Sequence, residues 1–241
     1  MSQVIWISHR GYCQNAVENT QKSFDAALEQ GFRHLETDLR STADGEIILQ
    51  HNATLDKTCG VANHVETSRW TDLKKIKTTD GQSLLTLTDL YRLYHPYKWI
   101  LDIKKPGDKR TLDLLVDWVR IHNAQAWVET NVRFLLWSRG TARHCEKLFP
   151  RVMTMAQEKE CYQAGLAVLL GLTRLGGLKK GRTYSIPPRF GKFRLFNSRT
   201  VEAYHAQGAW VLAYLPDRED DAKIAHSLGF DEILTNGRKL F

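Results

Sequence analysis

Long apolar runs are missing from this sequence. Of its 241 residues, 42% are hydrophobic, yet the longest apolar stretch, residues 164–172, is far too short to cross a bilayer. The start of the chain has no basic segment followed by an apolar one, which is the pattern of a secretory signal peptide. These absences favour a cytoplasmic protein without stable membrane insertion.

Closely spaced cysteines are missing as well. The four cysteines stand at positions 13, 59, 145 and 161, and none forms a C-x-x-C pair. This spacing argues against the common zinc and redox motifs. Reduced thiols, as in a cytoplasmic protein, are the simplest interpretation.

Acidic charge is in deficit, because the formal net charge is +7. Such a balance suits nucleic acid, an anionic small substrate or an acidic membrane surface. The densest basic groups lie at residues 74–77 and 178–182, and neither alternates with aromatic residues as a nucleic-acid groove would. We therefore expect two solvated patches and no nucleic-acid partner, and the oligomeric state stays open.

The order of expected elements indicates the fold. Eight strands are expected in addition to one hairpin arm, at residues 3–8, 33–39, 99–104, 132–138, 152–157, 183–186, 210–215 and 232–235. Helical spacing of apolar residues is expected at 18–30, 86–95, 110–122, 141–148, 158–172, 198–207 and 217–228. Alternating strands and helices predict a parallel sheet.

Eight such strands in a chain of this length predict a (β/α)8 barrel of the TIM type. We expect residues 1–241 to form one domain, with a small insertion at about 52–85, where the sequence is polar and weakly periodic. A doubly wound open sheet is the alternative, but no G-x-G-x-x-G follows the first strand.

A hairpin is expected directly after the second strand, where the sequence reads Ala-Asp-Gly-Glu at 43–46. A two-residue turn would place Asp38 opposite His51 and Glu36 opposite Ala53. Because side chains alternate along a strand, Glu36, Asp38 and His51 would then share one face. A shift of one residue would turn His51 away.

Three carboxylates stand at expected C-terminal strand ends, where sites form in such barrels. Glu36 and Asp38 are two residues apart, and Asp102 ends the next barrel strand. Carboxylates this close repel each other unless a cation lies between them. Pairing with Arg33 or Arg40 at the surface is the alternative. Three oxygen ligands and no thiol favour Mg²⁺ or Ca²⁺.

The same strand ends carry histidine and fixed positive charge. His9 and His51 can share the roles of base and acid near neutral pH, and His34 is a third candidate. Arg10 and Lys104 suit a phosphate group, although both could also neutralise the carboxylates. With a metal, these groups favour phosphoryl transfer from a phosphodiester.

At these residues the chain resembles the glycerophosphodiester phosphodiesterase family. The matching stretches are HRG, ENT, ETD, LQHNATL, LLTLTDL, DIKKP and GFDEILTN, which together span most of the chain. The family has a (β/α)8 barrel and hydrolyses glycerophosphodiesters to glycerol 3-phosphate and an alcohol with a divalent metal. Its small inserted segment, which covers the glycerol side, resembles the polar run after His51.

The resemblance also implies roles by position. It implies a catalytic pair, His9 and His51; metal ligands, Glu36, Asp38 and Asp102; phosphate contacts, Arg10 and Lys104; and a pocket residue, Tyr214. Glu18 and Asn19 are candidate supporting residues because they stand at the start of the first expected helix. Glu18 would either cap the first helix or orient Arg10. The attacking group is water or the substrate's own glycerol hydroxyl, through a cyclic phosphate.

Three departures from the family pattern concern metal preference and substrate range. The usual His-Asp is His51-Asn52, the usual Glu-x-Lys begins with Asp102, and Tyr214 stands where tryptophan is common. Two alternatives therefore remain: a lysophospholipase D-type enzyme at a membrane, and a barrel that binds phosphodiesters without cleaving them.

Overall fold

The computed structural model describes residues 4–216 and 218–240. Gln3 and Asp217, which begin an expected strand and an expected helix, lie outside them. The chain divides into two compact units: one of residues 9–154, and one that combines residues 1–8 with 155–241. Each unit is described by itself below. That the whole chain forms one domain stays a prediction.

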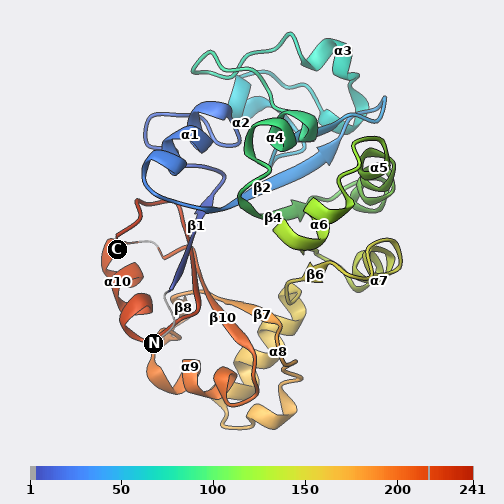
Figure 1. The fold of residues 1–241 in the computed structure, drawn as a ribbon. Helices are drawn as coiled ribbons and strands as arrows, with labels where there is room; N and C mark the ends of the chain where they lie inside the picture. The colour runs from blue at the N-terminus through green and yellow to red at the C-terminus, as the bar shows by residue number, and fades with distance from the viewer. Residues whose placement is uncertain (1–3, 217, 241) are drawn as a thin grey trace. The chain divides into compact units, whose positions relative to one another are not determined.

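The unit of residues 9–154 is built on a parallel sheet (Figure 1). Its strands are adjacent in the order β6, β5, β4, β2, with bounds Met153–Thr154, Val132–Leu135, Lys98–Ile103 and His34–Ser41. Its longer helices are α1 (Gln21–Glu29), α4 (Leu87–Tyr94), α5 (Asp108–Ile121), α6 (Gln125–Asn131) and α7 (Arg139–Leu148). Helix α6 was not expected from the sequence.

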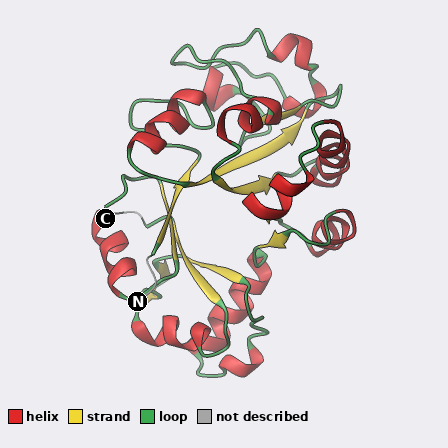
Figure 2. Cartoon of the chain, in the orientation of Figure 1, coloured by secondary structure: helices red, strands yellow, loops and turns green. Residues whose placement is uncertain are grey.

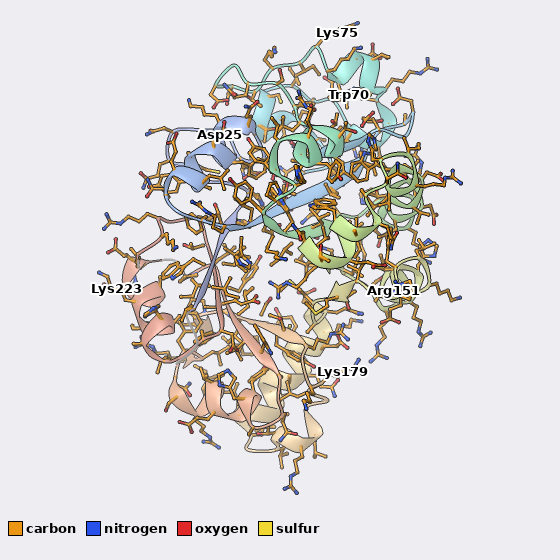
Figure 3. All side chains as sticks on the ribbon, in the orientation of Figure 1. Asp25, Trp70, Lys75, Arg151, Lys179 and Lys223 are labelled. Atoms are coloured by element: carbon orange, nitrogen blue, oxygen red, sulfur yellow. The ribbon has the colours of Figure 1, made fainter. Side chains whose placement is uncertain are left out.

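The core of this unit contains aromatic rings packed edge to face. Phe24 of α1 lies with its ring centroid 5.3 Å from that of Trp99 on β4 and 5.7 Å from that of Tyr94 on α4. The hydroxyl of Tyr94 donates a hydrogen bond to Asp25, which is labelled in Figure 3. These contacts attach α1 and α4 to the sheet.

Helix α1 begins later than the sequence pattern indicates. Thr20 is its N-cap, because its hydroxyl accepts from the backbone N–H of Ser23 while the Ser23 hydroxyl is bonded to Thr20 in return. This reciprocal pair is a capping box, which satisfies two otherwise unpaired N–H groups. Glu18 therefore lies before the helix and does not cap it.

The hairpin after β2 has a different register from the expected one. Leu39 pairs with Leu49 and Ser41 with Ile47 of β3 (Ile47–Leu49), so Gln50 rather than His51 follows opposite Asp38. The loop has three residues and ends at Gly45, whose φ of 93° glycine adopts without strain. The expected pairs Asp38–His51 and Glu36–Ala53 are wrong.

Residues 52–85 contain only short helices, drawn in red in Figure 2: α2 (Asp56–Cys59), η1 (Val65–Thr67) and α3 (Trp70–Leu73). Their apolar side chains share a cluster with β3, which comprises Ile48, Leu55, Val65, Leu73 and Leu84. Trp70, labelled in Figure 3, packs against this cluster. The segment is therefore anchored by a small core.

The other unit is also built on parallel strands. Their order is β1, β11, β10, β7, with bounds Ile5–His9, Glu232–Thr235, Trp210–Tyr214 and Thr183–Ile186. Its helices are α8 (Glu158–Leu169), η2 (Thr173–Leu175), α9 (Ser198–His205) and α10 (Glu219–Ser227). A small antiparallel hairpin, β8 (Arg189–Phe190) and β9 (Phe193–Arg194), was not expected.

Over the described residues of both units, eight parallel strands alternate with helices along the chain, as expected. Strand β3 is the antiparallel hairpin arm set aside in that count. In the same part of the chain, no helix combines the length and apolar character that a membrane span needs.

Candidate active site

Three buried carboxylates meet at one edge of the sheet in the unit of residues 9–154. Asp38 on β2 is the register partner of Asp102 on β4, and Glu36 precedes Asp38 by one full pleat. One oxygen from each of the three carboxylates lies within 4.8 Å of the others. Parallel pairing and alternation thus bring together the three residues that the sequence singled out.

Burial and mutual repulsion make the negative charge on these three carboxylates unfavourable unless a cation is bound between them. Burial raises the pKa of Glu36 well above its usual range, and the nearby Asp38 and Asp102 raise it further. Burial likewise raises the pKa of Asp102 to about 6. Glu36 Oε2 and Asp38 Oδ1 are buried without a hydrogen-bond partner among the described residues. Unpartnered carboxylate oxygens that converge in this way fit a divalent metal.

The alternative of simple surface ion pairs does not hold. Arg33 donates to the backbone carbonyls of Leu28 and Phe32. Arg40 pairs with Glu66 and donates to the carbonyl of His51. Neither arginine neutralises the carboxylate group.

Two other cations flank the carboxylates. Arg10 Nε lies 3.0 Å from Asp38 Oδ2, and Lys104 Nζ lies 3.0 Å from Asp102 Oδ2 and 3.4 Å from Asp38 Oδ1. Glu18 orients Arg10, because both of its oxygens lie 3.3 Å from Arg10 Nη1. Of the two roles expected for Glu18, its contacts therefore support the orientation of Arg10 and not the capping of the first helix.

Asn19 connects two strand residues of the site. Its amide nitrogen donates to Asp38 Oδ2 at 2.9 Å, and its amide oxygen accepts from the hydroxyl of Thr37 at 2.8 Å. Its backbone φ is 59°, a left-handed conformation that asparagine tolerates better than most residues. Asn19 therefore fixes the side chain of Asp38.

His9 is brought close to the carboxylates by its place at the end of β1. Its Nε2 lies 3.8 Å from Glu36 Oε2, and the ring is buried. His34 stands at the opposite end of β2, where burial and the charges of Arg133 and Lys98 lower its pKa to about 4. His34 is therefore a half-buried histidine at the far end of the strand from Asp38.

His51 reaches the site by a different route from the one expected. Strand β3 ends at Leu49, and two nitrogens of Arg40, Nε and Nη2, hold the carbonyl of His51 at 2.9 and 2.8 Å. Burial lowers the pKa of His51, which also feels the charges of Asp38, Lys104 and Arg10. Its Nδ1 lies 2.7 Å from Asn52 Oδ1. An amide oxygen only accepts, so Nδ1 carries the hydrogen and Nε2 is the basic atom.

Trp137 is a site residue that the sequence reasoning missed. It follows β5, and its indole N–H donates to Asp102 Oδ1 at 2.6 Å, while Lys104 Nζ lies 5.0 Å from the centre of its ring. The available signal was its position at the C-terminal end of the strand expected at residues 132–138. Tyr214 ends β10 in the other unit, and its place in the substrate pocket stays a prediction.

The comparison with known families agrees with this geometry. The sequence model of the glycerophosphoryl diester phosphodiesterase family matches residues 9–238. The chain belongs to this family.

Curated glycerophosphodiester phosphodiesterases are similar along their length. A probable glycerophosphodiester phosphodiesterase 2 of Mycobacterium tuberculosis is 25% identical over 240 residues, which is 96% of this chain and 87% of the relative. A glycerophosphodiester phosphodiesterase of Caldanaerobacter subterraneus is 23% identical, over 95% and 93% of the two chains. A member of this family with such relatives is a phosphoric diester hydrolase.

Solved structures of the family share the fold. The glycerophosphoryl diester phosphodiesterase domain of an uncharacterized Mycobacterium tuberculosis protein superposes with a TM-score of 0.81 at 13% identity, over 98% of this chain and 97% of that one. An Oleispira antarctica phosphodiesterase was solved in complex with the product sn-glycerol-3-phosphate. It superposes with a TM-score of 0.74 at 19% identity, over 98% of this chain and 94% of that one. The expected (β/α)8 fold class is thereby confirmed.

Proposed function

We propose that this member of the family is a metal-dependent enzyme that hydrolyses glycerophosphodiesters to glycerol 3-phosphate and an alcohol. The observation that carries the proposal is the buried group of Glu36, Asp38 and Asp102, in which two oxygens accept no hydrogen bond from the described residues and which lies beside two fixed cations. The Oleispira antarctica phosphodiesterase was solved with the product sn-glycerol-3-phosphate, which supports this choice of substrate.

Glu36, Asp38 and Asp102 would hold the ion, and their oxygen ligands favour Mg²⁺ or Ca²⁺. A bound divalent cation would polarise the phosphoryl oxygens and offset the charge that develops on them. All three ligands are at most 4% exposed, so their interaction with an ion would be weakly screened.

Arg10 and Lys104 would bind the phosphate. Arg10 Nε forms an ion pair with Asp38 and Nη1 donates to Glu18, and among the described residues Nη2 makes no hydrogen bond. Arg10 is thus oriented by one edge of its guanidinium and retains a donor for a phosphate oxygen. Lys104 supplies a second positive charge, and the carboxylates of Asp38 and Asp102 hold its Nζ in place.

The two histidines would move the protons. His51 suits the role of base, because its lowered pKa keeps the ring neutral near pH 7 and Nε2 is the basic nitrogen. His9 suits the role of acid by position, because its buried ring ends β1 beside the carboxylates, with Nε2 3.8 Å from Glu36 Oε2. The nucleophile that His51 would deprotonate is water or the substrate's glycerol hydroxyl.

Turnover of glycerophosphocholine, measured with EDTA and then with Mg²⁺ or Ca²⁺ added back, tests the metal. Activity should disappear in EDTA and return with one of the ions. His51→Ala and His9→Ala should each lower kcat by at least about 100-fold. The control His95→Gln changes an exposed histidine at the end of α4 and should retain activity.

Unchanged turnover in His51→Ala would refute the two-histidine mechanism. Substrate binding by calorimetry, without product at any metal concentration, would refute the proposed catalysis and favour a binding barrel. A search for cyclic glycerophosphate among the products distinguishes the two nucleophiles.

A further inference from the structure

A segment of the chain far in sequence from the catalytic candidates has no acidic residue at all. Residues 161–201 contain no aspartate or glutamate, but they contain eight basic residues: Arg174, Lys179, Lys180, Arg182, Arg189, Lys192, Arg194 and Arg199. The segment runs from α8 to α9 and lies entirely within the unit that contains residues 155–241. It therefore forms one strongly basic part of that unit.

The same segment exposes an apolar stripe on α8 and just beyond it. Tyr162, Leu166 and Leu170 are spaced by four residues, so they share one helix face, and each is more than half exposed. Leu172 and Leu175, which follow at η2, are exposed by 50% and 72%. A stripe of large apolar side chains in water is unusual for a surface without a partner.

The β8–β9 hairpin extends this stripe. Phe190 and Phe193 are cross-strand partners, and both are exposed, while Arg189 pairs with Arg194 next to them. The ring of Phe190 lies 5.9 Å from that of Tyr162 on α8. The hairpin and the helix thus form one continuous surface.

Most of the positive charge on this surface is not neutralised by the protein. Lys179, labelled in Figure 3, and Arg182 both pair with Glu160. Among the described residues, the others make no ion pair, and they are exposed: Arg174, Lys180, Arg189, Lys192, Arg194 and Arg199. An occupant of the surface must therefore be negatively charged and must also accept apolar side chains.

We propose that this surface, formed by Tyr162, Leu166, Leu170, Leu172, Leu175, Phe190 and Phe193 with the six exposed basic residues, binds reversibly to bilayers that contain anionic phospholipid. Apolar side chains at the level of the headgroups and basic side chains beside them are what binding to such an interface requires. The chain would lie on the membrane without crossing it.

Two features favour a bilayer over other anionic partners. Four of the seven apolar residues are leucines, which give bases no ring to stack on, whereas apolar side chains of either kind can insert at the level of lipid headgroups. The charge on the described residues of the surface is of one sign throughout, whereas protein interfaces usually pair opposite charges at fixed positions. A continuous negative lipid surface matches this uniform charge.

Flotation of the purified full chain with vesicles of phosphatidylcholine, with or without phosphatidylserine, tests the proposal. The protein should float with phosphatidylserine vesicles at low salt, should not float with phosphatidylcholine alone, and should be released by high salt. Phe190→Ser with Phe193→Ser, and separately Leu166→Gln with Leu170→Gln, should each weaken binding at least about tenfold.

Matched controls lie in the unit of residues 9–154. Ile121→Gln removes an equally exposed apolar side chain, and Lys74→Gln with Lys75→Gln removes two exposed lysines. These controls should bind as the unaltered chain does. All variants should keep their thermal unfolding temperature and their turnover of soluble glycerophosphocholine, so this test is independent of the proposed catalysis.

Absence of binding to phosphatidylserine vesicles at low salt would overturn the proposal. Equal binding by the phenylalanine and leucine variants would also overturn it. A dimer in lipid-free solution that dissociates on Leu166→Gln with Leu170→Gln would assign the surface to a second copy of the chain instead. Binding to single-stranded RNA in preference to vesicles would assign it to nucleic acid.

Discussion

The indole N–H of Trp137 donates a 2.6 Å hydrogen bond to Asp102, the carboxylate that stands where the family pattern has a glutamate. Lys104 donates to the other carboxylate oxygen of Asp102 at 3.0 Å. Both oxygens of Asp102 are therefore positioned by donors, although each keeps a lone pair for a cation. Because an aspartate is one methylene shorter than the usual glutamate, its position at the metal site depends strongly on such support.

Trp137→Phe should lower the affinity for Mg²⁺ or Ca²⁺ about tenfold, because it removes the N–H and retains an aromatic ring. Calorimetric titration of the ion measures this affinity directly. When Asp102→Glu is also present, Trp137→Phe should lower the ion affinity less, because the longer glutamate side chain reaches the ion without the support of the indole. Trp210→Phe alters another exposed tryptophan and is the control. Equal affinities for Trp137→Phe and the unaltered chain would contradict this role.

The stability of the metal-free protein should fall as pH rises. Burial raises the pKa of Asp102 to about 6 in the folded state, against 3.8 as the ordinary value, so between these values the folded chain holds more protons than the unfolded chain. Urea unfolding with EDTA present should show that the free energy of unfolding is lower at about pH 7 than at about pH 4. The Asp102 carboxyl should account for on the order of 1–3 kcal/mol of this difference.

Asp102→Asn isolates that contribution, because it removes the titrating group and keeps the shape of the side chain. The metal-free variant should be more stable than the unaltered chain at about pH 7, and its stability should vary less with pH. Addition of Mg²⁺ or Ca²⁺ should stabilise only the unaltered chain strongly. An identical pH dependence in both proteins would show that the Asp102 carboxyl is not strained by its burial.

Asn52→Asp should raise the pKa of His51. The substitution places a negative charge at the position of Asn52 Oδ1, which lies 2.7 Å from His51 Nδ1, and so favours the protonated ring. Titration followed by NMR should show a rise of about one pH unit, and the acidic limb of kcat/KM should shift by a similar amount. Asn123→Asp, remote from His51 in sequence, should leave both unchanged. A shift by NMR without one in the rate profile would mean that His51 is not the base.

Arg40→Lys should lower kcat about tenfold while the protein stays folded. Lysine cannot reproduce the two hydrogen bonds that Arg40 Nε and Nη2 donate to the single carbonyl oxygen of His51 and also keep a third nitrogen for Glu66. Circular dichroism should show that the variant is folded, and thermal unfolding should show that its free energy of unfolding falls by at most about 1–3 kcal/mol. Arg33→Lys is the matched control, because Arg33 donates hydrogen bonds to backbone carbonyls near α1 and lies over the ring of Tyr97, away from His51. Unchanged kcat in Arg40→Lys would mean that His51 holds its position without this support.

The sequence was sufficient for residues whose position follows from strand periodicity. Glu36 and Asp38 share a face because alternation along β2 requires it, and Asp102 joins them because neighbouring parallel strands end together. Strand periodicity does not determine the register of the hairpin formed by β2 and β3. Two-residue and three-residue loops both accept Asp-Gly with a glycine at positive φ, and only the pairing of the strands distinguishes them.

His51 and Trp137 show where local patterns cease to be informative. His51 lies near the carboxylates because Arg40, eleven residues earlier, holds its carbonyl outside any strand. Trp137 contributes through a hydrogen bond to a residue thirty-five positions away. Both relationships depend on the packing of separate segments, which no periodicity in a single segment encodes.

Arg40 also has a consequence for how this protein can change over evolution. Its guanidinium holds His51 on one side and Glu66 of the 52–85 segment on the other. Exchange of that segment for one from a relative would therefore disturb the histidine unless the incoming loop brings an acid to the same place. We therefore expect that changes in this segment that alter the substrate range keep an acidic residue at the position of Glu66.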